Sequence, residues 1–338
     1  MCQSLWNKPA KLLCWLLVLL LLLMGSFSGC WQEKVSRDGV SEKKLKIVAT
    51  IYPLAEFSSR IVGDNASVTQ LMPPGSEPHH WEPSPTDMKQ IYDAQVFIYH
   101  GAGMEPWVEK ILPALQERKI KIIKATEKAE MLTFAEEESL GVTKFLGSSS
   151  SGGEQIHEHN HGDENGVDPH AWLDPLQAKS IVSYIAQEIA AVDTVHSDCY
   201  LRNAQAVLDE LDQIHQEYSV AVSQFQRRDL VVSHAAFGYL ANRYGLCQIP
   251  ILGLTPEQEP DAATMAGVID FTRKQNIKYI FFEAMVSPRV AETIARETGA
   301  KTLVLHPIGA LTEEENKEGI DYFDLMHQNL ENLKKALK

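Results

Sequence analysis

Three histidines lie in stiff segments of this 338-residue chain, where they could act together as ligands of a metal ion. His170 lies in DPHAWLDP between two Asp–Pro corners, His79 lies in PPGSEPHHWEPSP, and His234 ends the apolar segment DLVVSH. Neutral imidazole is the commonest protein ligand for zinc, and Zn–N bonds of ~2.0–2.1 Å require ligands that are held in place. Prolines provide such rigidity because they fix φ. We therefore predict that the three imidazoles converge on one Zn²⁺ ion.

A second histidine cluster, His157, His159 and His161, lies in the tract GGEQIHEHNHGDENG. The letters HEHNH match the H-E-x-x-H motif of metalloproteases, in which two histidines share one face of a helix. The surrounding polar residues and glycines carry no apolar period that would fold such a helix, so we interpret the match as accidental. The tract belongs to a predicted mobile loop, 147–166, within a longer stretch, 127–167, that shows no strand or helix pattern and is interpreted as one long loop.

Strands and helices alternate along the rest of the chain, and these elements must position the histidines. Such alternation is typical of an α/β fold built from parallel βα units. In open α/β sheets, ligands bind beyond the carboxyl ends of the strands. His79 follows the second predicted strand and His234 ends the fifth, so both are expected at such an edge. The apolar patterns predict strands at 46–53, 67–73, 95–101, 121–126, 229–235, 247–253, 278–284 and 301–307, with helices between them and a last helix at 319–337.

The two halves of the chain have a similar βα rhythm and are predicted to form an N-terminal lobe, 45–195, and a C-terminal lobe, 227–338. Between them, residues 196–226 carry one apolar stripe at helical spacing and contain neither proline nor glycine. This segment predicts an unbroken linking helix that rises ~1.5 Å per residue. It is long enough to join the two lobes as a strut.

The N-terminus has the features of a targeting segment. Lys8 and Lys11 precede an apolar run at 12–24 that is too short to span a bilayer comfortably, and the segment GSFSGC then ends at Cys30. We predict a signal peptide at 1–29, a flexible tether at 30–44, and, since this segment resembles the lipobox of bacterial lipoproteins, a lipid on the Cys30 sulfur. The alternatives are an ordinary signal peptide and a signal anchor.

The chain is acidic, which bears on its partners. Its formal net charge is −14, and loss of 1–29, which carries two lysines and no acid, makes it −16. Such a surface disfavours nucleic acid and anionic lipid as partners. Cys199 and Cys247 could form a disulfide outside the membrane, but their spacing neither shows one nor provides a zinc motif.

Five motifs resemble, in order and spacing, the metal-specific solute-binding proteins of ABC importers, and most closely their zinc-specific lipoprotein branch. The resemblance covers residues 45–337 and implies two (βα)4-like parallel-sheet lobes, joined by the rigid helix, with the metal in the cleft between them. It carries the ligand role to His79, His170 and His234, and it implies that the loop of His157, His159 and His161 captures zinc weakly, the alternative being an inert linker. The motifs are GSEPHHWEPSP, YHGAGMEPWV, DPHAWLDP, VVSHAAFGYL and FFEAMVSPRVAETIARETGAKTLVLHPIGALT.

The fourth ligand is left open by the sequence. Some zinc members of that branch supply a glutamate after the last strand, where this chain has Gly309 in HPIGALT. Water, Glu283 in FFEA, or His306 could take the position, and we rank water and Glu283 above His306. Two further histidines have other interpretations: His80 can hardly share the ion with its neighbour His79, and His100 lines the cleft or caps a turn.

The predicted function is that of an extracytoplasmic, lipid-anchored zinc receptor, monomeric and without enzymatic activity, that delivers Zn²⁺ to an ABC permease. Nitrogen-rich sites favour zinc over manganese, although a manganese or iron receptor of the same fold is the first alternative. A zinc hydrolase with Glu283 as general base is the second alternative. Access to the ion separates the two classes: a hydrolase needs room for an organic substrate, whereas a receptor buries the ion behind side chains such as Trp81 and Phe237.

Overall fold

The structure, a computed structural model, describes residues 44–146, 166–253, 255–256 and 260–338. Residues 44–338 form one compact unit. The strands are β1 (Leu45–Ala49), β2 (Ala66–Gln70), β3 (Val96–Tyr99), β4 (Lys121–Lys124), β5 (Asp229–Val232), β6 (Cys247–Pro250), β7 (Tyr279–Phe282) and β8 (Lys301–Val304). The α-helices are α2 (Tyr52–Val62), α3 (Pro85–Tyr92), α4 (Val108–Glu117), α5 (Phe134–Ser139), α6 (Pro175–Val192), α7 (Ser197–Ser223), α8 (Gly238–Tyr244), α9 (Ala262–Lys274), α10 (Arg289–Thr298), α11 (Glu313–Glu318) and α12 (Tyr322–Leu337).

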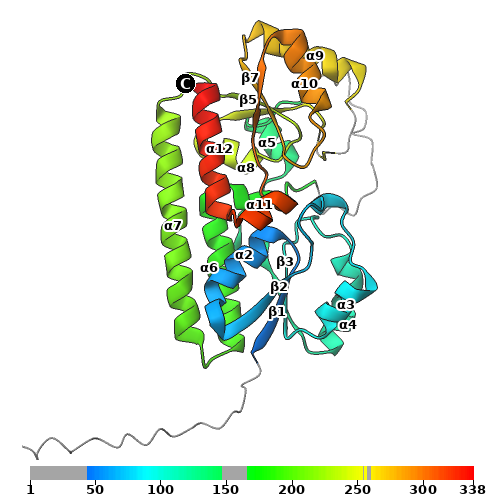
Figure 1. Ribbon diagram of the computed structural model, residues 1–338, viewed down its shortest axis with the longest axis vertical. Helices are drawn as coiled ribbons and strands as arrows, with labels where there is room; N and C mark the ends of the chain where they lie inside the picture. Colours follow the sequence, from blue (N-terminus) through cyan, green and yellow to red (C-terminus); the bar gives the residue numbers. More distant parts are fainter. Residues whose placement is uncertain (1–43, 147–165, 254, 257–259) are drawn as a thin grey trace, which may run out of the picture. The chain divides into compact units, whose positions relative to one another are not determined.

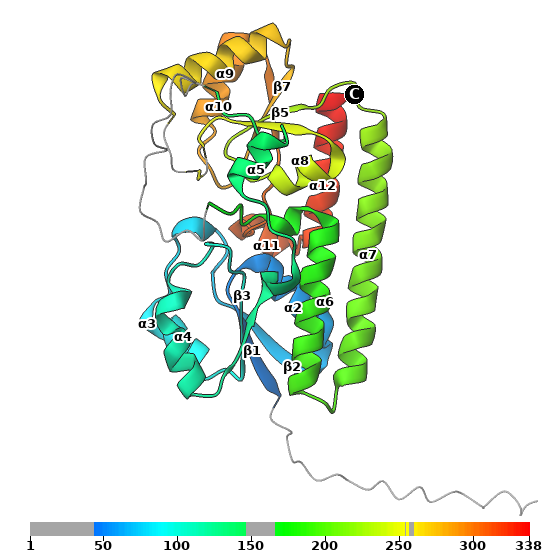
Figure 2. The same ribbon diagram turned by 180° about the vertical axis from the view of Figure 1, so that it is seen from behind.

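The first half contains a four-stranded parallel sheet with the order β2-β1-β3-β4. Every residue of β3 is buried, as is typical of a parallel strand that is covered on both faces. Ile47 and Ile98 point toward the core formed with α2 and α6, whereas Phe97 packs into a separate core with α3 and α4. Helices therefore cover both faces of this sheet (Figures 1 and 2).

The second half contains two parallel strand pairs instead of one four-stranded sheet. β5 pairs with β6, β7 pairs with β8, and β5 lies against β7. The described strands therefore form two separate two-stranded parallel sheets, with β5 and β7 lying next to each other. Residues of α9 and α10 cover one face and form a core of their own.

The long helix α7 runs alongside both halves (Figure 1). Its buried residues recur at intervals of three and four, which places them on one face. At ~1.5 Å per residue the helix extends about 40 Å. One apolar core joins α2, α6, α7 and α12, and Tyr218 on α7 donates a hydrogen bond of 2.7 Å to Met326 O on α12. This continuous core is the physical reason to expect little hinge motion between the halves.

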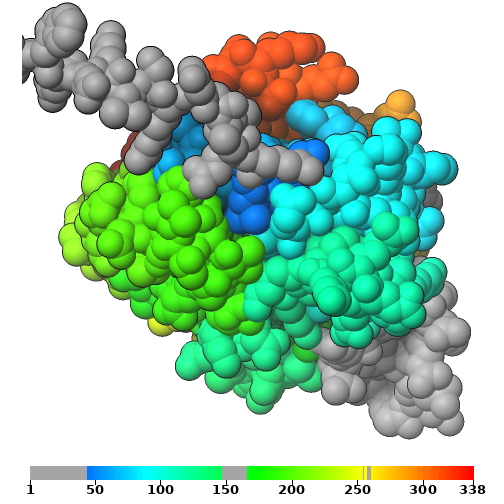
Figure 3. Space-filling model, turned by 90° about the horizontal axis from the view of Figure 1, so that it is seen from below, coloured from blue at the N-terminus to red at the C-terminus, as the bar shows by residue number. Residues whose placement is uncertain are grey.

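The start of β1 and the turn between α6 and α7 lie at the same end of the described unit. Leu45 pairs with Ala66, and the Asn65 side chain lies 3.3 Å from Cys199 Sγ on α7. Figure 3 shows this end, with the start of β1 in blue between the α6–α7 pair in green and the region of α3 and α4 in cyan. The carboxyl ends of the first sheet therefore point the other way, toward the second half.

The predicted α/β fold with a long linking helix is confirmed. The interpretation of the whole stretch 127–167 as loop was wrong, because α5 lies within it and begins with a capping box of Thr133 and Glu136. The lobe boundaries 45–195 and 227–338 stay predictions. The predicted signal peptide, Cys30, and His157, His159 and His161 lie outside the described residues. No helix of the described residues has both the length and the apolar character to span a membrane.

Candidate metal centre

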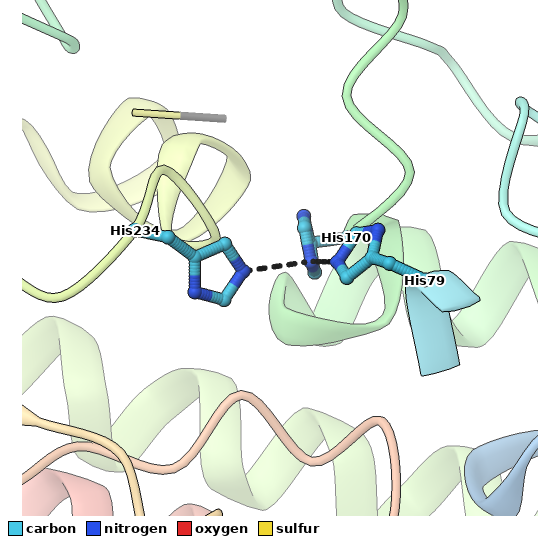
Figure 4. A group of neighbouring side chains, drawn as sticks. All are labelled: His79, His170 and His234. Carbon is cyan, nitrogen blue, oxygen red and sulfur yellow. Dashed lines mark hydrogen bonds between the residues drawn. The ribbon is translucent and has the colours of Figure 1, made fainter. Parts of the chain in front are cut away.

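His79, His170 and His234 come from three separate elements, and their rings converge (Figure 4). The Nε2 atom of His170 lies 3.2 Å from His79 Nε2 and 3.5 Å from His234 Nε2, and one nitrogen from each ring falls within a common 4.8 Å. Two nitrogens bound to one tetrahedral zinc at ~2.0–2.1 Å lie about 3.4 Å apart. The spacing of these imidazoles therefore suits a single tetrahedral ion.

His170 is positioned by two aspartates of its own segment. Asp168 Oδ1 accepts hydrogen bonds from the His170 backbone N–H at 2.9 Å and from His170 Nδ1–H at 2.7 Å. Asp174 then starts α6 by accepting from Leu176 N–H, and Arg243 binds its carboxylate. Because Nδ1 carries the proton that Asp168 accepts, the lone pair of Nε2 is free to face the other imidazoles.

His234 is positioned from the opposite half by Glu283. It follows β5, whereas Glu283 follows β7, and the contact between these two strands brings the two residues together. His234 Nδ1–H donates a hydrogen bond of 2.6 Å to Glu283 Oε1, and both side chains are buried. Here too the carboxylate fixes the tautomer in which Nε2 can bind a metal.

His79 lies on the short 3₁₀ turn η3 (Pro78–His80) and is held less firmly. Glu77 accepts a hydrogen bond from the His79 backbone N–H at 2.8 Å and so caps the turn. The His79 side chain is only partly buried, and among the described residues no carboxylate accepts a hydrogen bond from its ring. Its imidazole therefore depends on the backbone of η3 for its position.

The three imidazoles differ in protonation. Burial and the neighbouring imidazoles lower the pKa of His79 and of His170 well below the ordinary value. Burial also lowers the pKa of His234, but the charge of Glu283 and its hydrogen bond outweigh burial, so the net direction is upward. His79 and His170 are thus held neutral, whereas His234 retains a proton more readily than the other two imidazoles.

A small cavity of about 30 Å³ adjoins the three rings. Pro78, Met104, Trp172 and Met285 contribute to its wall, and the Trp172 indole donates to Pro307 O at 2.8 Å, which closes one side. A single water needs ~10–15 Å³, so the cavity holds water but no organic molecule of useful size. The expectation that Trp81 and Phe237 cover the site was wrong: Trp81 packs on Trp107 at 5.8 Å between ring centroids, and Trp172 takes this role.

The protein candidates for a fourth ligand, Glu283 and His306, line the cavity but do not join the close set of ligand atoms. In the described part of the chain, the set of mutually close ligand atoms comprises the three histidines and includes neither Glu283 nor His306. Glu283 is engaged with His234 Nδ1, and His306 Nδ1 accepts a hydrogen bond from Ile308 N–H while its Nε2 lies 3.4 Å from Glu315. Gly309 lines the cavity without contributing a ligand atom.

Other residues singled out from the sequence have structural positions. His100 is buried and donates to Pro169 O at 2.6 Å, so it supports the backbone next to His170. His80 is exposed. Cys199 and Cys247 are both free thiols, so the possible disulfide is not formed.

Sequence reasoning missed the role of Asp168 and Trp172. Asp168 stands two residues before His170, and an aspartate commonly accepts from the backbone N–H two residues on, so this spacing was an available signal. Trp172 had no comparable signal, because its contact with Pro307 joins residues 135 positions apart.

The comparisons with known proteins agree that this chain is similar to zinc-binding and zinc-uptake proteins. The family model described as zinc-uptake complex component A, periplasmic (ZnuA), matches residues 47–336. The chain is 36% identical over 321 residues to the zinc-binding protein AdcA of Streptococcus pyogenes, covering 94% of this chain and 61% of AdcA, so it spans about three fifths of that relative's length. It is 36% identical over 315 residues to the high-affinity zinc uptake system protein ZnuA of Bacillus subtilis, covering 93% and 94%. Its fold is similar to the Zn(II)-bound ZnuA-like domain of Streptococcus pneumoniae AdcA, with a TM-score of 0.72 and 36% identity over 87% of this chain and 99% of that domain.

Proposed function

The chain belongs to the ZnuA family of zinc-uptake components, and on that premise we propose that it is an extracytoplasmic receptor that binds Zn²⁺ as cargo for an ABC importer. His79, His170 and His234 are the proposed ligands. The observation that carries the proposal is the spacing of their Nε2 atoms, 3.2 and 3.5 Å, beside the ~3.4 Å expected around tetrahedral zinc. A water molecule in the adjoining cavity supplies the fourth position.

Zinc is the proposed cargo because the donor set is entirely imidazole nitrogen. Nitrogen-rich sites suit zinc, whereas carboxylate-rich sites suit manganese. Glu283, the carboxylate that supports the donor His234, is committed to the Nδ1 atom of that ring. The names of the relatives, zinc-binding protein and zinc uptake system protein, support the same choice.

A receptor role is favoured over hydrolysis by the size of the cavity. At about 30 Å³ it admits water beside the ion but leaves no room for an organic substrate. Glu283 lines the cavity, but its Oε1 already accepts the Nδ1 proton of His234, which favours a supporting role over that of a general base. A water molecule in the fourth coordination position also favours release of the ion, because a ligand set that the protein does not supply completely is easier to break up.

Delivery requires a location outside the cytoplasm and a membrane partner. We propose that the permease of an ABC importer accepts the ion, and that a lipid on Cys30 keeps the monomeric receptor at the membrane. Support comes from the lipobox-like segment before Cys30 and from a relative named zinc-binding lipoprotein. Mass spectrometry of the N-terminal peptide tests the anchor: the lipid mass is expected on Cys30 and is lost in Cys30→Ala.

Zinc titration of the purified protein in competition with a chelator of known affinity tests the function. One tight site is expected, and His170→Ala should abolish it while circular dichroism stays unchanged. Equal stabilisation by Mn²⁺ at equal free metal in thermal unfolding would contradict the choice of zinc. Unaltered affinity in His170→Ala would contradict the ligand set itself.

A further inference from the structure

Glu137 is a buried carboxyl group that the function described so far does not use. It lies on α5 with no exposed surface, in a stretch that carries no helical period in its sequence. Its Oε2 accepts hydrogen bonds from Thr143 Oγ1 at 2.6 Å and from Gln248 Nε2 at 3.3 Å. Its Oε1 is buried without a donor among the described residues. A buried carboxyl oxygen without a partner is costly, so it requires an explanation.

The explanation lies in Asp168, the residue that orients His170. Asp168 Oδ1 accepts both N–H groups of His170, but Asp168 Oδ2 is also buried without a donor among the described residues. The side chains of Glu137 and Asp168 are hydrogen-bonded to each other, and burial together with the charge of Asp168 raises the pKa of Glu137 to about 9. Two carboxyl groups in contact cannot both be ionised at neutral pH. Asp168 already accepts two N–H donors, whereas Glu137 Oε1 accepts none among the described residues, so this arrangement of donors places the shared proton on Glu137.

The same side chain also reaches the loop that carries His234. Gln248, which donates to Glu137, accepts a hydrogen bond from Phe237 N–H at 3.0 Å with its Oε1. A Cβ on Gly238 would come within 2.0 Å of Glu137 Oε1, so the carboxyl group lies directly against the backbone that follows His234. Glu137 thus lies between Asp168, which supports His170, and the backbone that follows His234 in the other half of the chain. The other ionisable groups around this pair are the Tyr239 hydroxyl and the imidazoles of His170 and His234.

We propose that Glu137 is a positioning residue of the metal centre: as a neutral acid it donates a hydrogen bond to Asp168 and thereby fixes the orientation of His170. The proposal rests on the proposed zinc function only for its affinity readout. The neutral acid satisfies both orphaned oxygens with one proton and adds no second negative charge beside Asp168. A carboxylate at this place would instead repel Asp168 and loosen its hold on His170.

Three variants test this assignment. Glu137→Leu keeps a similar volume but leaves Asp168 Oδ2 without a donor, and zinc affinity should fall 10- to 100-fold, as is typical when a group supporting a metal ligand is removed. Glu137→Gln restores an N–H donor for Asp168 and an acceptor for Thr143, so it should recover affinity to within about threefold of the unsubstituted protein. Glu138→Gln, an exposed change on the same helix, is the matched control and should alter nothing.

A measurement without metal separates this proposal from the zinc function. The imidazole Nδ1–H signal of His170 in proton NMR of the metal-free protein should shift in Glu137→Gln, broaden or vanish in Glu137→Leu, and stay in place in Glu138→Gln. If Glu137→Leu does not fold, Glu137→Gln decides alone: a tenfold or greater loss of affinity would mean that Glu137 acts as an anion and would overturn the proposal. An unmoved His170 signal in Glu137→Gln would overturn it as well. Absence of zinc binding in the unsubstituted protein would refute the function and leave the NMR test standing.

Discussion

His170 and His234 are held in the same way, and His79 is held differently. Each of the first two is buried and donates its Nδ1 proton to a buried carboxylate, Asp168 or Glu283. His79 lies partly exposed on a short 3₁₀ turn, which is fixed through its backbone by Glu77. Both buried imidazoles therefore keep their orientation by side-chain hydrogen bonds, whereas the orientation of His79 depends on the position of a turn.

This difference indicates an order of events in metal binding. A ligand that is oriented in advance loses little conformational freedom when the ion arrives, so it contributes more of its interaction energy to affinity. The buried pair, His170 and His234, should bind the ion first, and His79 on its turn should then complete the coordination. The continuous core along α6, α7 and α12 makes wide motion of the halves a poor way to release the ion. Displacement of the His79 turn is a less costly way.

The largest expected effect is the loss of one of the two buried imidazoles that are proposed as ligands. His170→Ala or His234→Ala should weaken zinc binding by more than the roughly 100-fold that marks the upper end for changes around a ligand. His79→Ala should cost less, because the oriented pair remains. Chelator competition on the three variants measures the ranking. An equal or greater loss in His79→Ala would remove the distinction between the pair and the turn.

The next effect concerns the carboxylates that support the pair. Asp168→Asn and Glu283→Gln should each lower zinc affinity about 10- to 100-fold, since an amide accepts the Nδ1 proton but supplies no charge. Glu77→Gln is the corresponding change at the turn, and it should cost clearly less because Glu77 supports a backbone N–H. The same competition assay applies, with circular dichroism as the control for folding. A comparable loss of affinity in Glu77→Gln would show that the position of the His79 turn depends on a carboxylate charge as much as the orientation of His170 and His234 does.

The sequence predicted the elements and the three imidazoles better than their supports. The eight strands and the α7 stripe follow apolar periods, which are local properties of the chain. The prolines and strand ends around His79, His170 and His234 are local as well. The roles of Glu283 and Glu137 could not be predicted, because each depends on which atom of a distant residue it faces after folding. The α5 helix was missed although Thr133 and Glu136 form a capping box, since six residues carry too little apolar pattern.

The dependence of zinc affinity on pH should come from His234, one member of the buried pair. The pKa of His234 is raised by Glu283, so as pH falls through that pKa a proton occupies Nε2 and zinc must displace it. The pKa values of His79 and His170 lie well below the ordinary value, so these two rings remain neutral over the same range. Zinc affinity should therefore be flat at higher pH and fall about tenfold per pH unit below the pKa of His234.

Glu283→Gln provides the control for this pH dependence. Without the carboxylate charge, burial lowers the pKa of His234, so proton competition begins at a lower pH. The affinities of the variant and of the unsubstituted protein should thus converge as pH falls from about 8 to about 5. Parallel curves, or a slope that indicates two protons, would mean that His79 or His170 also carries a proton in the metal-free protein.

The smallest expected effect is at Gly309, which contacts the turn and not the pair. A Cβ at this position would lie 2.9 Å from Pro78 Cγ, and Pro78 begins the turn that carries His79. Gly309→Ala should therefore push the turn outward and weaken zinc binding by about tenfold, since overpacking commonly costs ~1–3 kcal/mol, a partly exposed turn can yield at the lower end of that range, and 1.4 kcal/mol is a factor of ten. The pair is untouched, so the dependence of affinity on pH should keep its shape.

A double-mutant cycle shows whether Gly309→Ala acts through His79. In the His79→Ala background the turn carries no ligand, and Gly309→Ala should then have no further effect on affinity, because the two changes remove the same contribution. Full additivity of the two changes would contradict this interpretation. It would mean that Gly309 acts on the cavity or on Trp172, whose ring would lie 3.6 Å from the added methyl group, and that the turn is as rigid as the buried pair.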